Sequence, residues 1–205
     1  MAGARVVSLM AWDNVLFPGM LMPLHVDQPD DLMLIHHCLD ASGEFGMVLE
    51  TDDPLRPQQT GTVAKIIDYQ SKDDGELTLL ITGMERFAIA EMIDDQPYLT
   101  GMIEPSRLIY DTPSSDLAIR AAQARRLFRR CVRLIATQRD MDVCDLPTLP
   151  ARTSDLGWAI ASALAIPPEE RQRLLEKGSA ESLLQTEILY LESLLVDLRH
   201  GVEGD

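Results

Sequence analysis

The chain has 205 residues, of which 46% are hydrophobic and 25% are charged, a balance typical of a globular protein with one or two domains. Its formal net charge is -15, and residues 1–110 carry 6 Lys and Arg against 18 Asp and Glu, a net of -12. Because anionic surfaces repel one another, this half argues against binding to nucleic acid and to an anionic membrane.

The cellular compartment is predicted from the apolar runs and the cysteines. No run approaches the ~20 apolar residues that a membrane-spanning helix needs, and the N-terminus lacks the pattern of a signal peptide. Cys38, Cys131 and Cys144 are widely spaced, with no C-x-x-C pair. We therefore expect a cytoplasmic protein with free thiols.

The first elements are short and apolar. Residues 6–10 predict a strand, and a turn follows at Trp12-Asp13-Asn14. The stretch from Val15 to Val26 is apolar but contains Pro18, Gly19 and Pro23, which excludes a helix. It predicts a turn at Pro18-Gly19 and then a bent strand over residues 20–26.

One helix interrupts the strands. Pro29 at the first helical position, followed by Asp30 and Asp31, predicts a helix that ends at Ser42-Gly43. Asp74-Gly75 between two apolar runs predicts a hairpin. The further strands are expected at residues 45–49, 61–69, 76–83, 86–92 and 98–103. Residues 1–112 thus predict a small mixed β-barrel with one inserted helix.

After Pro113 the periodicity becomes helical. Helices are expected over residues 115–139, 153–165 and 168–177, and a last one begins after Ser179. The fold class is therefore α+β, with a barrel over residues 1–112 and a C-terminal helical bundle over residues 113–205.

Several segments carry a resemblance to one family, the Lon protease N-terminal (LON substrate-binding) domain. The matching segments, which span nearly the whole chain in the expected order, are Leu16-Phe17-Pro18-Gly19-Met20, Pro23-Leu24-His25, Gly61-Thr62-Val63-Ala64-Lys65-Ile66, Gly83-Met84-Glu85-Arg86-Phe87, Tyr98-Leu99, Asp155-Leu156 and Arg171-Gln172-Arg173-Leu174-Leu175-Glu176. The resemblance implies a barrel of PUA-like type backed by a helical bundle. One departure is Asp30-Asp31, where the family often has an aromatic and a basic residue.

The attached activities of a full Lon protease are not visible in this sequence. It contains no Gly-Lys pair and hence no phosphate-binding loop. A serine–lysine dyad is not expected either, because Lys65 lies in a predicted strand and Lys72 and Lys177 lie at predicted turns. The chain is therefore interpreted as a stand-alone, non-catalytic LON-domain protein.

The resemblance implies a function in binding polypeptides. The expected partners are exposed apolar segments of unfolded or degradation-bound proteins, a protease to which they are delivered, and a second copy of the chain. The chain would then act as an adaptor or regulator in protein quality control. Phe17, Met20 and Met22 are the predicted peptide-binding residues, lining an exposed apolar groove; the alternative is that the ten methionines fill the core.

The remaining candidate sites are weaker. His36-His37 could indicate a metal, but adjacent helical residues point about 100° apart, so a surface role is favoured and no metal or cofactor is expected. His25 with Asp27 could be half of a hydrolase relay, yet no nucleophile motif accompanies it, so no catalytic residue is predicted.

The helix over residues 115–139 is rich in arginine, which leaves an alternative function open. PUA-like barrels include RNA binders, and this helix could contact RNA. The competing interpretation is a solvated face that balances the acidic barrel, because aromatic residues do not alternate with the arginines.

Overall fold

Buried and exposed side chains alternate along the strands of the N-terminal half, as β2 shows. In this computed structural model, which describes residues 3–53, 55–72, 75–94, 96–107, 115–139 and 148–200, Met22, Leu24 and Val26 are buried and the residues between them are exposed. The strands within the described residues are β1 (Arg5–Trp12), β2 (Leu21–Val26), β3 (Glu44–Leu49), β4 (Thr60–Ser71), β5 (Leu77–Ile93) and β6 (Thr100–Pro105).

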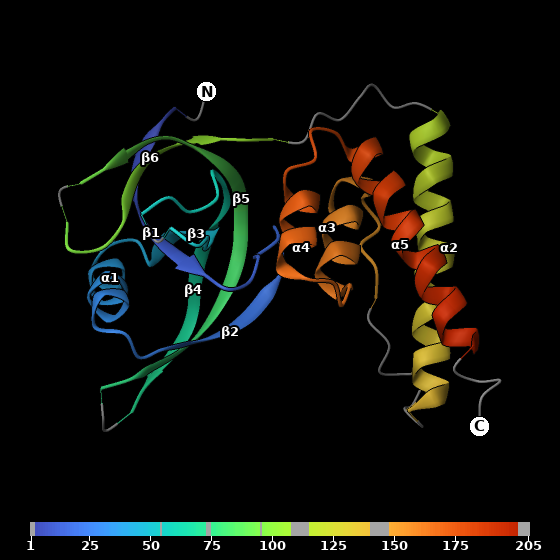
Figure 1. The fold of residues 1–205 in the computed structure, drawn as a ribbon, viewed down its shortest axis with the longest axis horizontal. Helices are drawn as coiled ribbons and strands as arrows, with labels where there is room; N and C mark the ends of the chain where they lie inside the picture. The colour runs from blue at the N-terminus through green and yellow to red at the C-terminus, as the bar shows by residue number, and fades with distance from the viewer. Residues whose placement is uncertain are drawn as a thin grey trace. The chain divides into compact units, whose positions relative to one another are not determined.

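These strands form one sheet that closes on itself. Their order is β2-β5-β4-β3-β1-β6, and a further pairing of β5 with β6 completes the ring (Figure 1). Only β1 and β3 pair in parallel in this described sheet. β2 lies at the edge of the sheet and pairs with β5 on one side. Pro23, which has no N–H to donate, is tolerated in such an edge strand. The predicted mixed barrel is confirmed.

The strand β5 differs from its prediction. Residues 76–83 and 86–92 were expected to form two strands, but Leu77–Ile93 is continuous. Gly83 does not interrupt it, because the Gly83 N–H donates to the Met20 carbonyl at 2.9 Å and its own carbonyl accepts from the Gly19 N–H at 2.8 Å. A Cβ on Gly83 would lie 2.1 Å from the Phe17 carbonyl oxygen. The glycine therefore permits close approach of two backbones and does not end a strand.

The barrel contains two apolar clusters. Leu9 and Met10 are successive residues of β1 and point to opposite faces, one to each cluster. The first cluster is covered by α1 (Pro29–Asp40), which buries Leu34, Ile35 and Cys38. The second contains Phe87, against which glycines pack tightly: a Cβ on Gly61 would lie 2.6 Å from the Phe87 ring.

The C-terminal half supplies four helices within the described residues. They are α2 (Ser115–Gln138), α3 (Thr153–Ala163), α4 (Pro168–Leu175) and α5 (Ala180–His200). α2 and α5 run side by side, and α3 packs on α5 (Figure 1). Ser179 caps α5, as expected, by accepting the Ser182 N–H at 3.2 Å.

The chain divides into two compact units. The barrel unit comprises residues 1–107 and 165–176, and the helical unit comprises residues 108–164 and 177–205. The boundary predicted between residues 112 and 113 lies outside the described residues. α4 was grouped with the helical half in the sequence, whereas in the structure it belongs to the barrel unit, because its side chains and its C-terminal carbonyl bond to barrel residues.

Candidate functional site

Of the predicted peptide-binding residues, Phe17 and Met20 lie at the turn that precedes β2, and Met22 lies in β2 itself. The Met20 N–H donates to the Phe17 carbonyl at 3.0 Å, and Gly19 has a φ of 78°. Proline followed by glycine with positive φ fits a type II turn. The turn was predicted, and it folds the chain back over β5 at Gly83.

These residues do not form the expected exposed groove. Phe17 is 0% exposed and Met22 is 7% exposed, and Met20 is partly buried against the first cluster. The reason is the two-residue period of β2, which directs Met22 inward and Leu21 outward. The alternative interpretation, in which methionines fill the core, describes Met22 and Met47.

α4 holds this turn in place. Arg171 is buried, its guanidinium carbon lies 4.9 Å from the centroid of the Phe17 ring, and its Nη2 donates to the Val15 carbonyl at 3.1 Å. Desolvation by burial lowers the pKa of Arg171 below its ordinary value. Phe17 is thus a packing partner of α4.

A second contact fixes the other end of α4. Arg86 Nε donates to the Ser106 carbonyl at 2.8 Å, and Arg86 Nη1 donates to the Leu175 carbonyl at 2.5 Å. The last carbonyls of a helix have no partner within the helix. A cation at this end also interacts favourably with the helix dipole. The arginine of the Gly83-to-Phe87 segment therefore anchors the α4 terminus.

An open pocket lies elsewhere in the barrel unit, and we call it the α1 pocket. It has a volume of about 730 Å³ and lies between the start of α1, the loop after β3 and the turn between β5 and β6. Its floor is the accessible side of the second cluster. Its apolar lining residues include Leu9, Ala11, Leu55, Met92, Ile93, Tyr98 and Leu99.

The rim of the α1 pocket is acidic. Its carboxylates are Asp30, Asp31, Glu50 and Asp94, and none of the described lining residues is Lys, Arg or His. Burial raises the pKa of the Asp31 carboxyl, and the neighbouring charges of Asp30 and Asp27 raise it further. The pocket therefore combines an apolar floor with carboxylates that repel one another.

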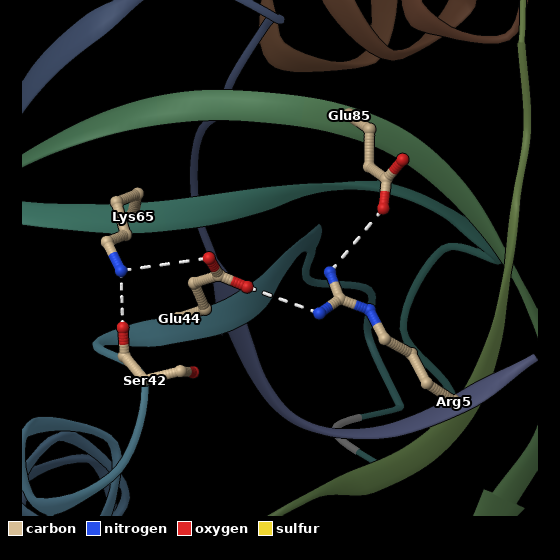
Figure 2. A network of polar contacts seen from close by, with 5 residues as sticks. All are labelled: Arg5, Ser42, Glu44, Lys65 and Glu85. Carbon is tan, nitrogen blue, oxygen red and sulfur yellow. Dashed lines mark hydrogen bonds and ion pairs between the residues drawn. The ribbon is translucent and has the colours of Figure 1, made fainter. Parts of the chain in front are cut away.

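Polar contacts of the barrel cations form a separate network (Figure 2). Arg5 lies 3.2 Å from Glu44 and 3.5 Å from Glu85. Lys65 Nζ lies 3.7 Å from Glu44 and also donates to the Ser42 carbonyl. These contacts join β1, β3, β4 and β5, and they engage two cations of the barrel at a site that shares no residue with the α1 pocket.

The helical unit carries a basic depression on α2. It has a volume of about 660 Å³, and its lining includes Arg125, Arg126, Arg129, Arg130 and Arg133. Arg125 Nη2 donates to the Ala151 carbonyl at 2.9 Å. Across the described part of the chain, no carboxylate forms an ion pair with any of these five.

The histidines that were considered as metal or relay candidates lie at exposed positions. His36 and His37 are exposed on α1, and the His37 ring lies 6.1 Å from the Tyr98 ring. His25 lies 3.3 Å from Glu76, while Asp27 accepts from the Gln28 side chain. No group of three or more His, Cys, Asp or Glu side chains is placed to hold a metal ion within the described residues.

No helix that the structure describes is both long enough and apolar enough to cross a bilayer.

The α1 pocket was missed in the sequence because its parts are distant. Glu50 follows β3, Asp94 follows β5, and only Asp30 and Asp31 are neighbours along the chain. The one available signal was the Asp30-Asp31 departure from the family pattern.

Comparison with solved structures supports this fold. The N-terminal domain of a Lon protease of the Mycobacterium avium complex superposes with a TM-score of 0.73 at 17% identity, covering 92% of this chain and 98% of that one. A Lon N-terminal domain protein from Xanthomonas campestris gives a TM-score of 0.64 at 22% identity, covering 89% and 96%. At these identities the likeness shows the fold alone.

Sequence comparison gives the family. A Lon protease of Roseiflexus castenholzii is 29% identical over 199 residues, covering 92% of this chain and 24% of that protein. One of Phenylobacterium zucineum is 28% identical over 200 residues, covering 91% and 24%. The chain thus spans about a quarter of the length of these curated relatives. The family model of the ATP-dependent protease La (LON) substrate-binding domain matches residues 6–193. The chain therefore belongs to the LON substrate-binding domain family.

Proposed function

We propose that this chain is a non-catalytic module that binds exposed apolar segments of unfolded polypeptides through the α1 pocket. The observation that carries the proposal is an apolar-floored pocket of about 730 Å³ in a member of a substrate-binding domain family. That volume lies in the range of sites that take small ligands or a few side chains. The proposed site replaces the groove expected at Phe17, Met20 and Met22.

Two lining residues suit varied apolar partners. Leu55 is 73% exposed, so its side chain is available to a bound segment. Met92 is partly buried at the floor, and its flexible thioether can adapt to different shapes. Covering Leu55 with an apolar partner would contribute about 1.5–3 kcal/mol if the side chain became fully buried.

The wider role follows from the family. The relatives are Lon proteases, and this chain matches about a quarter of their length. We therefore place the module in protein quality control, as an adaptor or regulator that presents polypeptides to a protease. The sequence adds that no Gly-Lys pair, and hence no phosphate-binding loop, is present in these 205 residues.

The test compares two states of one client. A fluorescently labelled model protein is offered folded and then unfolded by reduction and alkylation, and binding is followed by anisotropy. The unfolded form should bind at least ten-fold more tightly, and Leu55→Ser should weaken that binding several-fold. Leu189→Ser is the matched control, because Leu189 is 58% exposed on α5, outside the pocket.

Two results would contradict the proposal. One is equal affinity for folded and unfolded client. The other is an equal effect of Leu55→Ser and Leu189→Ser, which would show that the α1 pocket has no special part in binding.

A second candidate function is RNA binding by the arginine-rich helix. The observation that favours it is the depression on α2 with five arginines outside any ion pair of the described residues. The net charge of -15 opposes it. Binding through four phosphates would give a salt slope of roughly -3 in log K against log salt. A mobility-shift titration of single-stranded RNA at several salt concentrations tests this, and absence of that slope removes the candidate.

A further inference from the structure

We propose that the α1 pocket selects polypeptide segments in which a lysine or arginine lies beside an apolar side chain. This inference rests on the proposed function and specifies which segments the pocket prefers. It follows from the combination of an apolar floor, an acidic rim and the absence of basic side chains among the lining residues that the structure describes.

The acidic rim is not neutralised by the pocket itself. Asp30 and Asp31 come from α1, Glu50 follows β3, and Asp94 follows β5. No ion pair within the described residues involves any of these four carboxylates. Any side chain that enters the pocket therefore passes between unpaired negative charges.

Apart from Arg107, the Lys and Arg side chains of the barrel unit have partners outside the α1 pocket. Five of them form ion pairs: Arg5 and Lys65 with Glu44, Arg56 with Asp53, Lys72 with Glu76, and Arg173 with Glu170. Two donate to backbone carbonyls: Arg86 to Ser106 and Leu175, and Arg171 to Val15. None of them lines the α1 pocket.

The helix dipole opposes a cation here, but it is the smaller effect. The N-terminus of α1 acts as roughly half a positive charge. Asp30 and Asp31, in the first turn, already supply two negative charges, and Glu50 and Asp94 add two more across the pocket. The net field at the rim is therefore negative.

Asp31 shows that this arrangement is strained electrostatically. Its carboxyl is half-buried, and Asp30 and Asp27 both disfavour its ionised form. An incoming ammonium or guanidinium would reverse that repulsion and stabilise the charged carboxylate. A neutral apolar segment would leave that repulsion in place and would desolvate the carboxylate further.

Lysine and arginine also match the floor. Their aliphatic stems cover apolar surface while the charged end stays at the rim. A neighbouring apolar side chain of the same segment can then occupy the floor beside Leu99 and Met92. The pocket would therefore recognise an apolar-basic pair, while an acidic neighbour would be repelled.

The experiment uses three labelled peptides of equal length and the full chain. They share one apolar core and differ only in the flanking residues. These are lysine and arginine in the basic peptide, glutamine in the neutral peptide and glutamate in the acidic peptide. In 50 mM KCl we expect the basic peptide to bind about ten-fold more tightly than the glutamine peptide and the acidic one to bind more weakly than both. In 500 mM KCl the preference should fall to about two-fold, because salt screens exposed charges.

Variants locate the preference. Asp31→Asn with Glu50→Gln should bring the ratio of basic to glutamine affinities close to one. Asp40→Asn with Glu104→Gln is the matched control: it removes the same charge from exposed positions outside the pocket, and the ratio should stay near ten. Circular dichroism melting curves check that both variants fold.

The outcomes separate the two proposals. Equal affinity for all three peptides overturns the cationic preference and leaves the proposed function intact. No binding of any peptide overturns both. If the ratio of basic to glutamine affinities falls equally in both double variants, the preference comes from the overall charge of the protein, and the assignment to this pocket is overturned. Self-association that the peptide displaces would make a second copy the occupant, which also overturns it.

Discussion

The guanidinium carbon of Arg171 lies 4.9 Å from the centroid of the Phe17 ring, so a residue near the end of the chain covers an aromatic side chain near its beginning. The same guanidinium donates to the Val15 carbonyl. The segment before β2 therefore depends on α4 for its position. The contribution of these Arg171 contacts can be measured as a change in the free energy of unfolding.

Arg171→Ala should destabilise the barrel unit by about 2–4 kcal/mol, since it removes a buried donor from the Val15 carbonyl together with the packing on Phe17. Urea unfolding is followed by Trp12 fluorescence in a Trp158→Phe background, so that the signal reports the barrel unit. Arg173→Ala is the control, because Arg173 is exposed on the same helix and pairs only with Glu170 in the described contacts; it should change stability by less than about 0.5 kcal/mol. Similar losses for both variants would contradict the prediction.

Gly83→Ala should destabilise the barrel unit by about 3 kcal/mol or more, since the new Cβ would meet the Phe17 carbonyl at 2.1 Å and backbone cannot move aside as a side chain can. The same Trp12 signal measures the effect. Gly178→Ala is the control: nothing lies within 4 Å of its Cβ position, and its effect should stay within about 1 kcal/mol. A near-neutral Gly83→Ala would show that the turn and β5 can separate.

Glu187 makes the helical unit sensitive to pH. This α5 residue is 0% exposed, and burial raises the pKa of its carboxyl well above the ordinary value. Because the folded pKa exceeds the unfolded one, its stability contribution is complete below about pH 4 and is lost as pH rises toward and through the folded pKa. Glu187→Gln should remove that loss, whose slope is at most about 1.4 kcal/mol per pH unit.

Urea unfolding between pH 5 and 9, read by Trp158 in a Trp12→Phe background, measures this difference. Glu192→Gln, an exposed change on the same helix, should keep the wild-type slope. Parallel curves for wild type and Glu187→Gln would refute the pH dependence assigned to this carboxyl.

The network in Figure 2 should contribute little. Arg5 and Glu85 are both more than two-fifths exposed and lie 3.5 Å apart, a geometry that typically yields 0.2–1 kcal/mol. A double-mutant cycle with Arg5→Gln and Glu85→Gln should give a coupling energy in that range, and it should fall further at 1 M salt. A coupling above about 2 kcal/mol would show that the network is more than a surface feature.

Local signals predicted most of the fold. Pro18-Gly19 specified a turn, Pro29 with Asp30 and Asp31 specified the start of α1, and Ser179 specified the cap of α5. Each of these depends on residues that are neighbours along the chain. The prediction failed just after Gly83, where one strand was expected to end before another began at residue 86. The strand β5 continues instead, and Gly83 allows the Phe17 backbone to approach.

The site was less predictable because tertiary contacts decide it. An apolar Phe17 beside a turn is compatible with exposure or burial, and Arg171 settles the matter from the far end of the chain. In the same way, nothing near Glu50 or Asp94 in the sequence indicates that they meet Asp31 around one pocket. Pairings of this kind follow from the order of strands in the sheet.

The assignment of α4 to the barrel unit limits how the protein can be cut or recombined. The chain passes between the units after residues 107, 164 and 176. A truncation at residue 107 would therefore keep Arg86 and Phe17 but delete Leu175 and Arg171, and the shortened product should aggregate. Chimaeras that exchange residues 1–107 between relatives must carry residues 165–176 with them, or graft that helix back through a short designed linker.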